Sequence, residues 1–243
     1  MSTITTKRSS SRSPDQMRPV SLEVGYTRHA EGSCLVCFGS TWVLCNATVE
    51  EKLPPFLRDS RQGWVTAEYS MLPRATLTRT QRERGQVNGR TQEIQRLIGR
   101  SLRSTVSLKA LGERQIIVDC DVLQADGGTR TAAITGSYVA LALAVNKLYQ
   151  EGKLKAMPQM TPIAAVSCGI IGGQAMLDLD YIEDAGAEVD ANFVINHERK
   201  IVEIQGTAEA KAFSENELYQ MLELAHAGVA QLLELQSQAL DGR

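Results

Sequence analysis

The tetrapeptide at residues 127–130, Gly-Gly-Thr-Arg, has the composition of a site that binds an anion. It follows a strand-like apolar segment at residues 116–123 and precedes an alanine-rich, helix-prone segment at residues 132–145. Glycine lets an anion approach the backbone, and the first turn of a helix carries free N–H groups and partial positive charge. Arg130 adds a guanidinium that can hold phosphate through two hydrogen bonds. We therefore predict a phosphate-binding turn, with a tight turn and an exposed arginine as the alternative. The Lys-Ser/Thr ending of a nucleoside triphosphatase loop is absent.

A second group of reactive side chains is acidic. Six carboxylates lie close together in the sequence, at Asp178, Asp180, Glu183, Asp184, Glu188 and Asp190. If residues 174–182 form a strand, Asp178 and Asp180 share one of its faces. Asp184 then falls at or past the end of that strand, and Asp190 at the start of the next. Carboxylates crowded near a phosphate site can hold Mg²⁺ or protonate a leaving oxygen. An acidic, solvated hairpin is an equally weighted alternative.

A third feature is a strip rich in arginine. Between residues 74 and 103 it contains Arg74, Arg79, Arg82, Arg84, Arg90, Arg96, Arg100 and Arg103, opposed by two glutamates. Residues 74–89 have few apolar side chains, which predicts a mobile, positive loop of about 16 residues, and such loops are usually functional or disordered. Because neutralising several phosphates holds a polynucleotide regardless of its sequence, RNA or DNA contact is favoured over a solvated loop. The following helix is expected at residues 91–106, with Thr91 as its cap and Arg90 just before its positive end.

The composition excludes several classes of protein. The chain has 243 residues, is 43% hydrophobic and has a formal net charge of −2, so it can bury a substantial core and is not a basic nucleic-acid coat. Its five cysteines are scattered through strand-like runs, which indicates buried, reduced thiols, and Cys34 and Cys37 lack a second pair that would complete a metal site. The three histidines show no spacing of ligands or nucleophiles. Because no apolar run is long enough for a membrane span or a secretion signal, we expect a cytoplasmic protein with no membrane segment.

The order of elements predicts an α+β fold. Residues 1–17 are rich in serine and threonine and are expected to form a disordered N-terminal tail, whereas residues 18–240 are expected to form a single domain. Strands are expected at residues 22–26, 33–38, 42–49, 63–72, 116–123, 163–171, 174–182, 189–196 and 200–206, and helices at residues 91–106, 132–150 and 214–238. Ser214 and Glu217 form a capping box at the start of the last helix. This order indicates two similar halves, each a mixed sheet covered by helices.

Several stretches of this sequence match the motifs of one family. They are residues 28–33 (RHAEGS), 63–69 (GWVTAEY), 71–74 (MLPR), 89–91 (GRT), 93–96 (EIQR), 119–130 (DCDVLQADGGTR), 181–184 (YIED) and 204–209 (IQGTAE). Together they are highly specific, and the chain resembles the ribonuclease PH family from about residue 18 to residue 238. That family comprises phosphate-dependent 3′-to-5′ exoribonucleases that trim transfer RNA precursors.

The resemblance implies a fold, an assembly and a set of site residues. The fold is that of two related βαβα halves with left-handed crossovers, assembled as a homohexamer, a ring of three dimers. The implied residues are Arg90, Gly128, Thr129 and Arg130 for orthophosphate, Asp184 and Asp190 for catalysis, and Arg74, Arg79 and Arg82 for transfer RNA. The two aspartates match acidic positions associated with Mg²⁺ or with proton transfer.

The implied activity is removal of nucleotides from the 3′ ends of transfer RNA precursors, with ribosomal RNA as a further substrate. Phosphate would attack the last phosphodiester and release a nucleoside diphosphate, and the reverse reaction would transfer nucleotides to RNA 3′ ends. Because two anionic groups must meet, charge neutralisation and positioning should carry most of the catalysis. One alternative is a non-catalytic RNA-binding subunit of an exosome-like ring, which would be expected to lack the phosphate or acidic residues. Another is a metal-dependent hydrolytic nuclease, which would need the acids but not the phosphate site.

Overall fold

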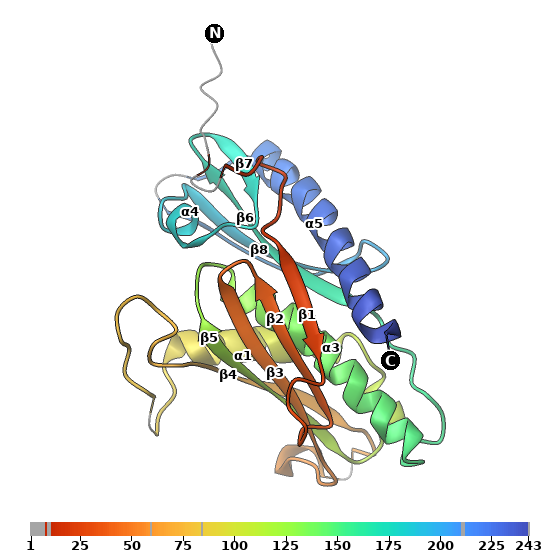
Figure 1. Cartoon of the computed structure of the whole chain (residues 1–243). Helices are drawn as coiled ribbons and strands as arrows, with labels where there is room; N and C mark the ends of the chain where they lie inside the picture. The colour runs from red at the N-terminus through yellow and green to blue at the C-terminus, as the bar shows by residue number, and fades with distance from the viewer. Residues whose placement is uncertain (1–7, 9–10, 59, 84, 210–211, 243) are drawn as a thin grey trace.

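The chain folds into two sheets with helices packed around them (Figure 1). The computed structural model describes residues 8, 11–58, 60–83, 85–209 and 212–242. The first half contains β1 (Val20–Val24), β2 (Gly32–Phe38), β3 (Thr41–Glu50), η1 (Pro55–Leu57), β4 (Trp64–Met71), α1 (Gly89–Arg103), α2 (Leu108–Leu111), β5 (Gln115–Gln124) and α3 (Thr129–Gln150). The second half contains β6 (Ile163–Ile171), β7 (Gln174–Leu177), α4 (Tyr181–Ala185), β8 (Val189–Asn196), β9 (Ile201–Ala208) and α5 (Glu215–Asp241). The predicted α+β class is therefore confirmed.

The first sheet is mixed and has the strand order β1-β2-β3-β5-β4. Its strands alternate buried and partly exposed residues, because one face packs against α3 and the other is open. Strands β4 and β5 pair in parallel, with Met71 opposite Val122. The carboxyl ends of parallel strands meet at the same sheet edge. The arginine-rich loop after β4 and the Gly-Gly turn after β5 therefore leave the sheet side by side.

The second sheet has the order β7-β6-β8-β9, and its described strands all pair antiparallel. A mixed second sheet was expected, so that part of the prediction is wrong. The strand expected at residues 174–182 is also shorter, because β7 ends at Leu177 and Asp178 has a positive φ of 54°. Asp178 and Asp180 therefore do not share a strand face, and the chain turns into α4 instead.

Helix α3 (green in Figure 1) lies between the two sheets and packs against β2, β3 and β6. By length and composition it could cross a membrane, but 83% of its apolar window is buried inside the protein, and that burial accounts for its composition. Helix α5 covers β6 and β7, and α1 packs on β4. All five cysteines are free thiols, and burial raises the pKa of Cys34 to about 12, so this thiol is neutral at physiological pH.

The described part of the N-terminal segment is packed against the second half. Arg8 is buried and pairs with Glu183, and the backbone N–H of Leu177 donates to the carbonyl of Pro14. A tail separate from the fold, expected from composition at residues 1–17, is therefore wrong for residues 8 and 11–17. Residues 1–7 and 9–10 lie outside the described residues.

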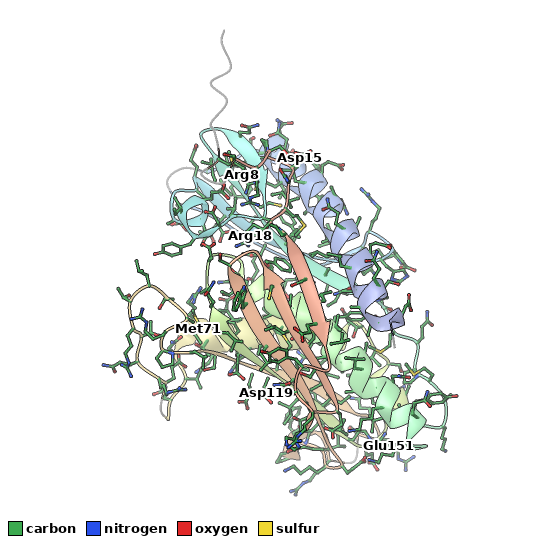
Figure 2. All side chains as sticks on the ribbon, viewed as in Figure 1. Arg8, Asp15, Arg18, Met71, Asp119 and Glu151 are labelled. Carbon is green, nitrogen blue, oxygen red and sulfur yellow. The ribbon has the colours of Figure 1, made fainter. Side chains whose placement is uncertain are left out.

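The open face of the first sheet contains a carboxyl group that should respond to pH. Asp119 (labelled in Figure 2) lies on β5 directly opposite Glu68 of β4. Burial, together with the charges of Glu68 and Asp121, raises the pKa of Asp119 to about 6. A carboxyl whose pKa rises on folding binds its proton more tightly in the folded state. Its contribution to stability is therefore present below about pH 4 and is lost as the pH rises through 6.

We expect Asp119→Asn to raise the free energy of unfolding at pH 8 by about 1 kcal/mol, after allowance for solvent screening of this half-buried group. At pH 4 the variant and the parent should unfold with nearly equal free energy. Denaturant unfolding at the two pH values measures this difference. Glu198→Gln is the control, because a hydrogen bond from Lys200 lowers the pKa of Glu198 and its neutralisation should give no gain. Equal stability of Asp119→Asn and the parent at pH 8 would contradict the prediction.

Candidate active site

The Gly-Gly turn between β5 and α3 leaves the start of a buried helix open. Gly127 and Gly128 have positive φ angles of 71° and 63°, and Gly128 is the N-cap of α3 without a side-chain cap hydrogen bond. The helix begins at Thr129, earlier than the expected residue 132, so Thr129 and Arg130 lie in its first turn. An uncapped first turn presents backbone N–H groups and the positive end of the helix dipole to an anion.

Hydrogen bonds hold this turn in one conformation. The Thr41 hydroxyl donates to the carbonyl of Gly127 over 2.6 Å and accepts from the N–H of Asp126 over 2.9 Å. The Tyr69 hydroxyl contacts the hydroxyl oxygen of Thr129 at 2.8 Å. Tyr69 is buried, and burial raises the pKa of its hydroxyl, so it remains a neutral donor. The Thr129 side chain thus has a fixed orientation at the N-terminus of α3.

Gly127 also lies where the two halves meet. A Cβ at this position would lie 2.6 Å from the carbonyl oxygen of Leu179 and 2.9 Å from the backbone nitrogen of Tyr181. We expect Gly127→Ala to lower the free energy of unfolding by about 2–4 kcal/mol, from the strained φ together with the steric overlap. Gly173→Ala is the matched control, because Gly173 has a φ of 75° and a Cβ added there would meet no atom within 4 Å. Denaturant unfolding of both variants separates the steric overlap from the strained φ. An equal decrease in the free energy of unfolding would show that the overlap at Gly127 costs nothing.

Two arginines converge on this turn from different helices. Arg130 in α3 donates from Nη1 to Glu93 (3.1 Å) and to Gln205 (2.9 Å). Its Nε and Nη2 groups have no hydrogen-bond partner among the described residues. Arg90 is exposed in the first turn of α1. The charges of both arginines act on the hydroxyl of Tyr69 and on the carboxyl of Asp184 and favour the ionised form of each, so both cations lie close to these groups.

The start of α1 differs from the predicted one. Its N-cap is Asn88, whose side chain accepts a hydrogen bond from the N–H of Thr91 over 2.8 Å. Thr91 is therefore not the cap, and Arg90 lies inside the first turn rather than before it. The error arises because Asn and Thr are both favoured caps, and only the backbone conformation decides between them.

Asp184 and Asp190 form the acidic side of the site. Asp184 lies in α4, and burial raises its pKa, although the charges of Arg130 and Arg90 act in the opposite direction. Asp190 lies on β8, and burial followed by the charge of Asp184 raises its pKa to about 6. Neither carboxylate has a side-chain hydrogen bond among the described residues. A carboxyl group with a pKa near 6 can carry a proton at neutral pH and can donate it to a leaving oxygen.

The other carboxylates of the acidic run have structural roles. Asp178 pairs with Arg18, and Glu183 pairs with Arg8. Asp180 caps α4 by accepting hydrogen bonds from the backbone N–H groups of Ile182 and Glu183. The predicted cluster therefore contains acids that are paired within the fold and two acids, Asp184 and Asp190, on which the charge of Arg130 acts. One further acid, Glu209, is not among the site residues predicted from the sequence. Its charge raises the pKa of both Asp184 and Asp190, so it lies near them.

The arginines of the strip divide in the same way. Arg74, Arg79 and Arg82 are exposed in the loop between β4 and α1, which extends away from the sheets in Figure 1. In contrast, the guanidinium of Arg103 lies 4.4 Å from the ring centroid of Trp64 and donates to the backbone of Val65. RNA contact by the three loop arginines stays a prediction. Arg103 supports the fold, and Arg84 lies outside the described residues.

Comparison with known proteins places the chain in a family. Residues 16–146 match the model of the 3′ exoribonuclease family, domain 1, and residues 161–228 match domain 2. The fold is similar to that of Rrp46 from rice (Oryza sativa), with a TM-score of 0.79 and 19% identity over 96% of this chain and 100% of that one.

Two archaeal structures are similar as well. The Archaeoglobus fulgidus exosome with RNA bound to its active site gives a TM-score of 0.80 at 21% identity, over 94% of this chain and 92% of that one. An archaeal exosome core gives a TM-score of 0.74 at 18% identity, over 95% of this chain and 91% of that one. Because these identities are low, the likeness of structures establishes the fold, whereas the two family models together cover most of the sequence. The chain is thus a member of the 3′ exoribonuclease family of the RNase PH type.

Proposed function

We propose that this protein is a phosphorolytic 3′-to-5′ exoribonuclease. The observation that carries the proposal is that an anion-binding site and protonatable carboxyl groups lie next to each other. An uncapped helix N-terminus and two arginines, Arg90 and Arg130, lie beside two carboxyl groups of raised pKa, Asp184 and Asp190. A hydrolytic nuclease has to bind only the scissile phosphodiester, whereas an enzyme that uses phosphate as the nucleophile needs a second anion site beside it.

The arrangement assigns each group a role in the reaction. The N–H groups at the start of α3, together with Arg130 and Arg90, bind and orient orthophosphate. A phosphate oxygen attacks the phosphorus of the last phosphodiester, the bond to the 3′-oxygen breaks, and a nucleoside diphosphate is released. Asp190 or Asp184 donates a proton to the leaving 3′-oxygen. The same groups operate in the reverse direction when nucleotides are transferred to an RNA 3′ end.

Asp184 and Asp190 also suit a bound Mg²⁺ ion. Mg²⁺ is usually held by one or two carboxylates together with substrate phosphates. Burial and the charge of Asp184 raise the pKa of Asp190, and Mg²⁺ held by these residues would take the place of the proton and favour their ionised form. When bound, Mg²⁺ would neutralise charge on the phosphates.

The proposed substrate is the 3′ end of a transfer RNA precursor, with ribosomal RNA as a further one. Arg74, Arg79 and Arg82 are exposed on a loop that leaves the sheet beside the phosphate-binding turn, so they can contact backbone phosphates upstream of the reacting end. A homohexamer built as a trimer of dimers is the proposed assembly.

A second candidate function is that of an RNA-binding subunit in an exosome-like ring. It is favoured by the similarity of the fold to rice Rrp46 and to archaeal exosome structures. The two candidates differ in one respect: a subunit that only binds RNA needs cations such as Arg130 but not the two carboxyl groups of raised pKa, Asp184 and Asp190, beside them.

The deciding experiment is a product analysis. The protein is incubated with Mg²⁺ and a transfer RNA with a short 3′ extension, with and without phosphate. We expect nucleoside diphosphates only when phosphate is present. Monophosphates in both reactions would indicate a hydrolase, and bound but intact RNA would support the RNA-binding subunit.

A further inference from the structure

Arg18 is a buried cation that contacts several separate parts of the chain. It lies just before β1, at the boundary between the two halves (Figure 2), and its side chain is 6% exposed. Its guanidinium forms a bidentate pair with Asp178, with Nε to Oδ2 at 3.0 Å and Nη2 to Oδ1 at 2.7 Å. Its Nη1 group donates to the backbone carbonyl of Asp126 and to the hydroxyl of Thr41, the latter at 3.4 Å.

The contacts of Arg18 in the first half lie on the phosphate-binding turn. Asp126 immediately precedes Gly127, and Thr41 is the residue that holds the Gly127 carbonyl. A Cβ at Gly128 would lie 3.1 Å from Nη2 of Arg18, so the guanidinium lies against the N-cap of α3. The position of the first turn of α3 therefore depends on this side chain.

The contacts of Arg18 in the second half lead to α4. Asp178 is held at a positive φ of 54°. Beside it, the guanidinium of Arg8 donates to the carbonyls of Leu177 (2.9 Å) and Asp178 (3.1 Å) and pairs with both carboxylate oxygens of Glu183 (2.7 and 2.6 Å). Glu183 also completes the capping box of α4. The next residue in the chain is Asp184.

We propose that Arg18 is a positioning residue, which holds the phosphate-binding turn of the first half at a fixed distance from the segment of the second half that carries Asp184. This inference rests on the proposed function, because it concerns the distance between bound phosphate and the acid. Arg18 touches neither reactant. It acts through Asp126 on one side and through Asp178 on the other, and a planar guanidinium can make both sets of contacts at once.

The test is to replace Arg18 with lysine, which keeps the charge but cannot bridge both sides. We expect Arg18→Lys to raise the KM for phosphate and to lower kcat, so that kcat/KM falls roughly 100-fold, as a displacement of about 1 Å can do. Asp178→Asn should act in the same direction, and asparagine tolerates the positive φ at this position. If the two residues act as one unit, the double variant should lose little more than each single variant.

Arg114→Lys is the matched control. Arg114 also joins a carboxylate, Glu51, to the backbone carbonyls of two other segments, at Leu111 and Lys153. It lies just before β5, at the opposite end of that strand from the Gly-Gly turn. Loss of a structural arginine lowers the thermal midpoint and the active fraction but leaves the KM for phosphate unchanged.

The measurements are kcat, the KM for phosphate and the thermal midpoint of the full chain, with direct binding of inorganic phosphate to each variant. A higher KM in Arg18→Lys but not in Arg114→Lys supports the inference. An unchanged KM in Arg18→Lys overturns it, as does an equal change in both variants. A parent protein that neither binds phosphate nor releases diphosphates overturns the proposed function itself, and it does so without reference to any variant.

Discussion

Replacement of Arg130 with alanine should lower kcat/KM for phosphate by about 10²- to 10³-fold, the range for loss of one preorganised donor that faces developing charge. Arg130 is fixed in the first turn of α3 by Glu93 and Gln205, which bind only its Nη1 group and leave Nε and Nη2 for an anion. Most of the effect should be a higher KM for phosphate. Initial rates at increasing phosphate concentration, with one RNA substrate, measure it.

Two further variants identify the cause of that loss. Arg130→Lys should recover only part of the activity, because an ammonium cannot bind phosphate in the bidentate manner. Glu93→Gln removes the partner and keeps the cation, and its effect should be small because the Glu93 side chain is 43% exposed. If Arg130→Ala retains the parent's phosphate dependence, the phosphate site does not include Arg130.

The second large effect is expected at Asp190. Asp190→Asn keeps the size of the side chain but removes the acid, so kcat should fall by about 10²- to 10⁴-fold, the range for loss of general acid catalysis. The KM for phosphate should stay the same or decrease, because the variant removes a negative charge near the anion. Asp190→Asn should therefore act mainly on kcat, and Arg130→Ala mainly on the KM for phosphate. Steady-state kinetics distinguish the two effects.

The controls for Asp190 come from the same acidic run. Glu188 lies two residues before Asp190, and its side chain accepts a hydrogen bond from the N–H of Gly173. Glu188→Gln should retain the activity of the parent. Asp184→Asn combined with Asp190→Asn should cost less than the sum of the two single effects, because the charge of Asp184 raises the pKa of Asp190 and Arg130 acts on both carboxyls. A normal kcat in Asp190→Asn would exclude it as the proton donor.

The local part of the candidate site could be predicted from the sequence. The Gly-Gly-Thr-Arg turn has a signature within a few residues, and its position between a strand and a helix follows from the change in hydrophobic periodicity. Asp184 and Asp190 belong to an acidic run that is evident in the sequence, but the run itself does not separate them from Asp178 and Glu183. That separation depends on which carboxylates find an arginine partner, and the partners lie 160 and 175 residues away.

The errors in the fold have related causes. Residues 1–17 have almost no apolar side chains, so composition predicts disorder, but Arg8 is buried by its ion pair with Glu183 rather than by hydrophobic contact. The strand predicted at residues 174–182 has a suitable pattern and is ended by the positive φ at Asp178, where Arg18 binds the carboxylate and Arg8 and Arg12 bind the carbonyl. Neither arrangement leaves a periodic signal in the sequence.

The pairing of Arg8 with Glu183 has a consequence for the order of folding. The two residues are 175 positions apart, so Arg8 of a growing chain lacks its carboxylate partner until most of the protein has been synthesised. The N-terminal part of a protein generally folds first during synthesis, and all five strands of the first sheet are made before β6. The pair between Arg8 and Glu183 can form only after β7 and α4 have been synthesised. We therefore expect assembly of the candidate site to be among the last steps of folding, after the core around α3 has closed.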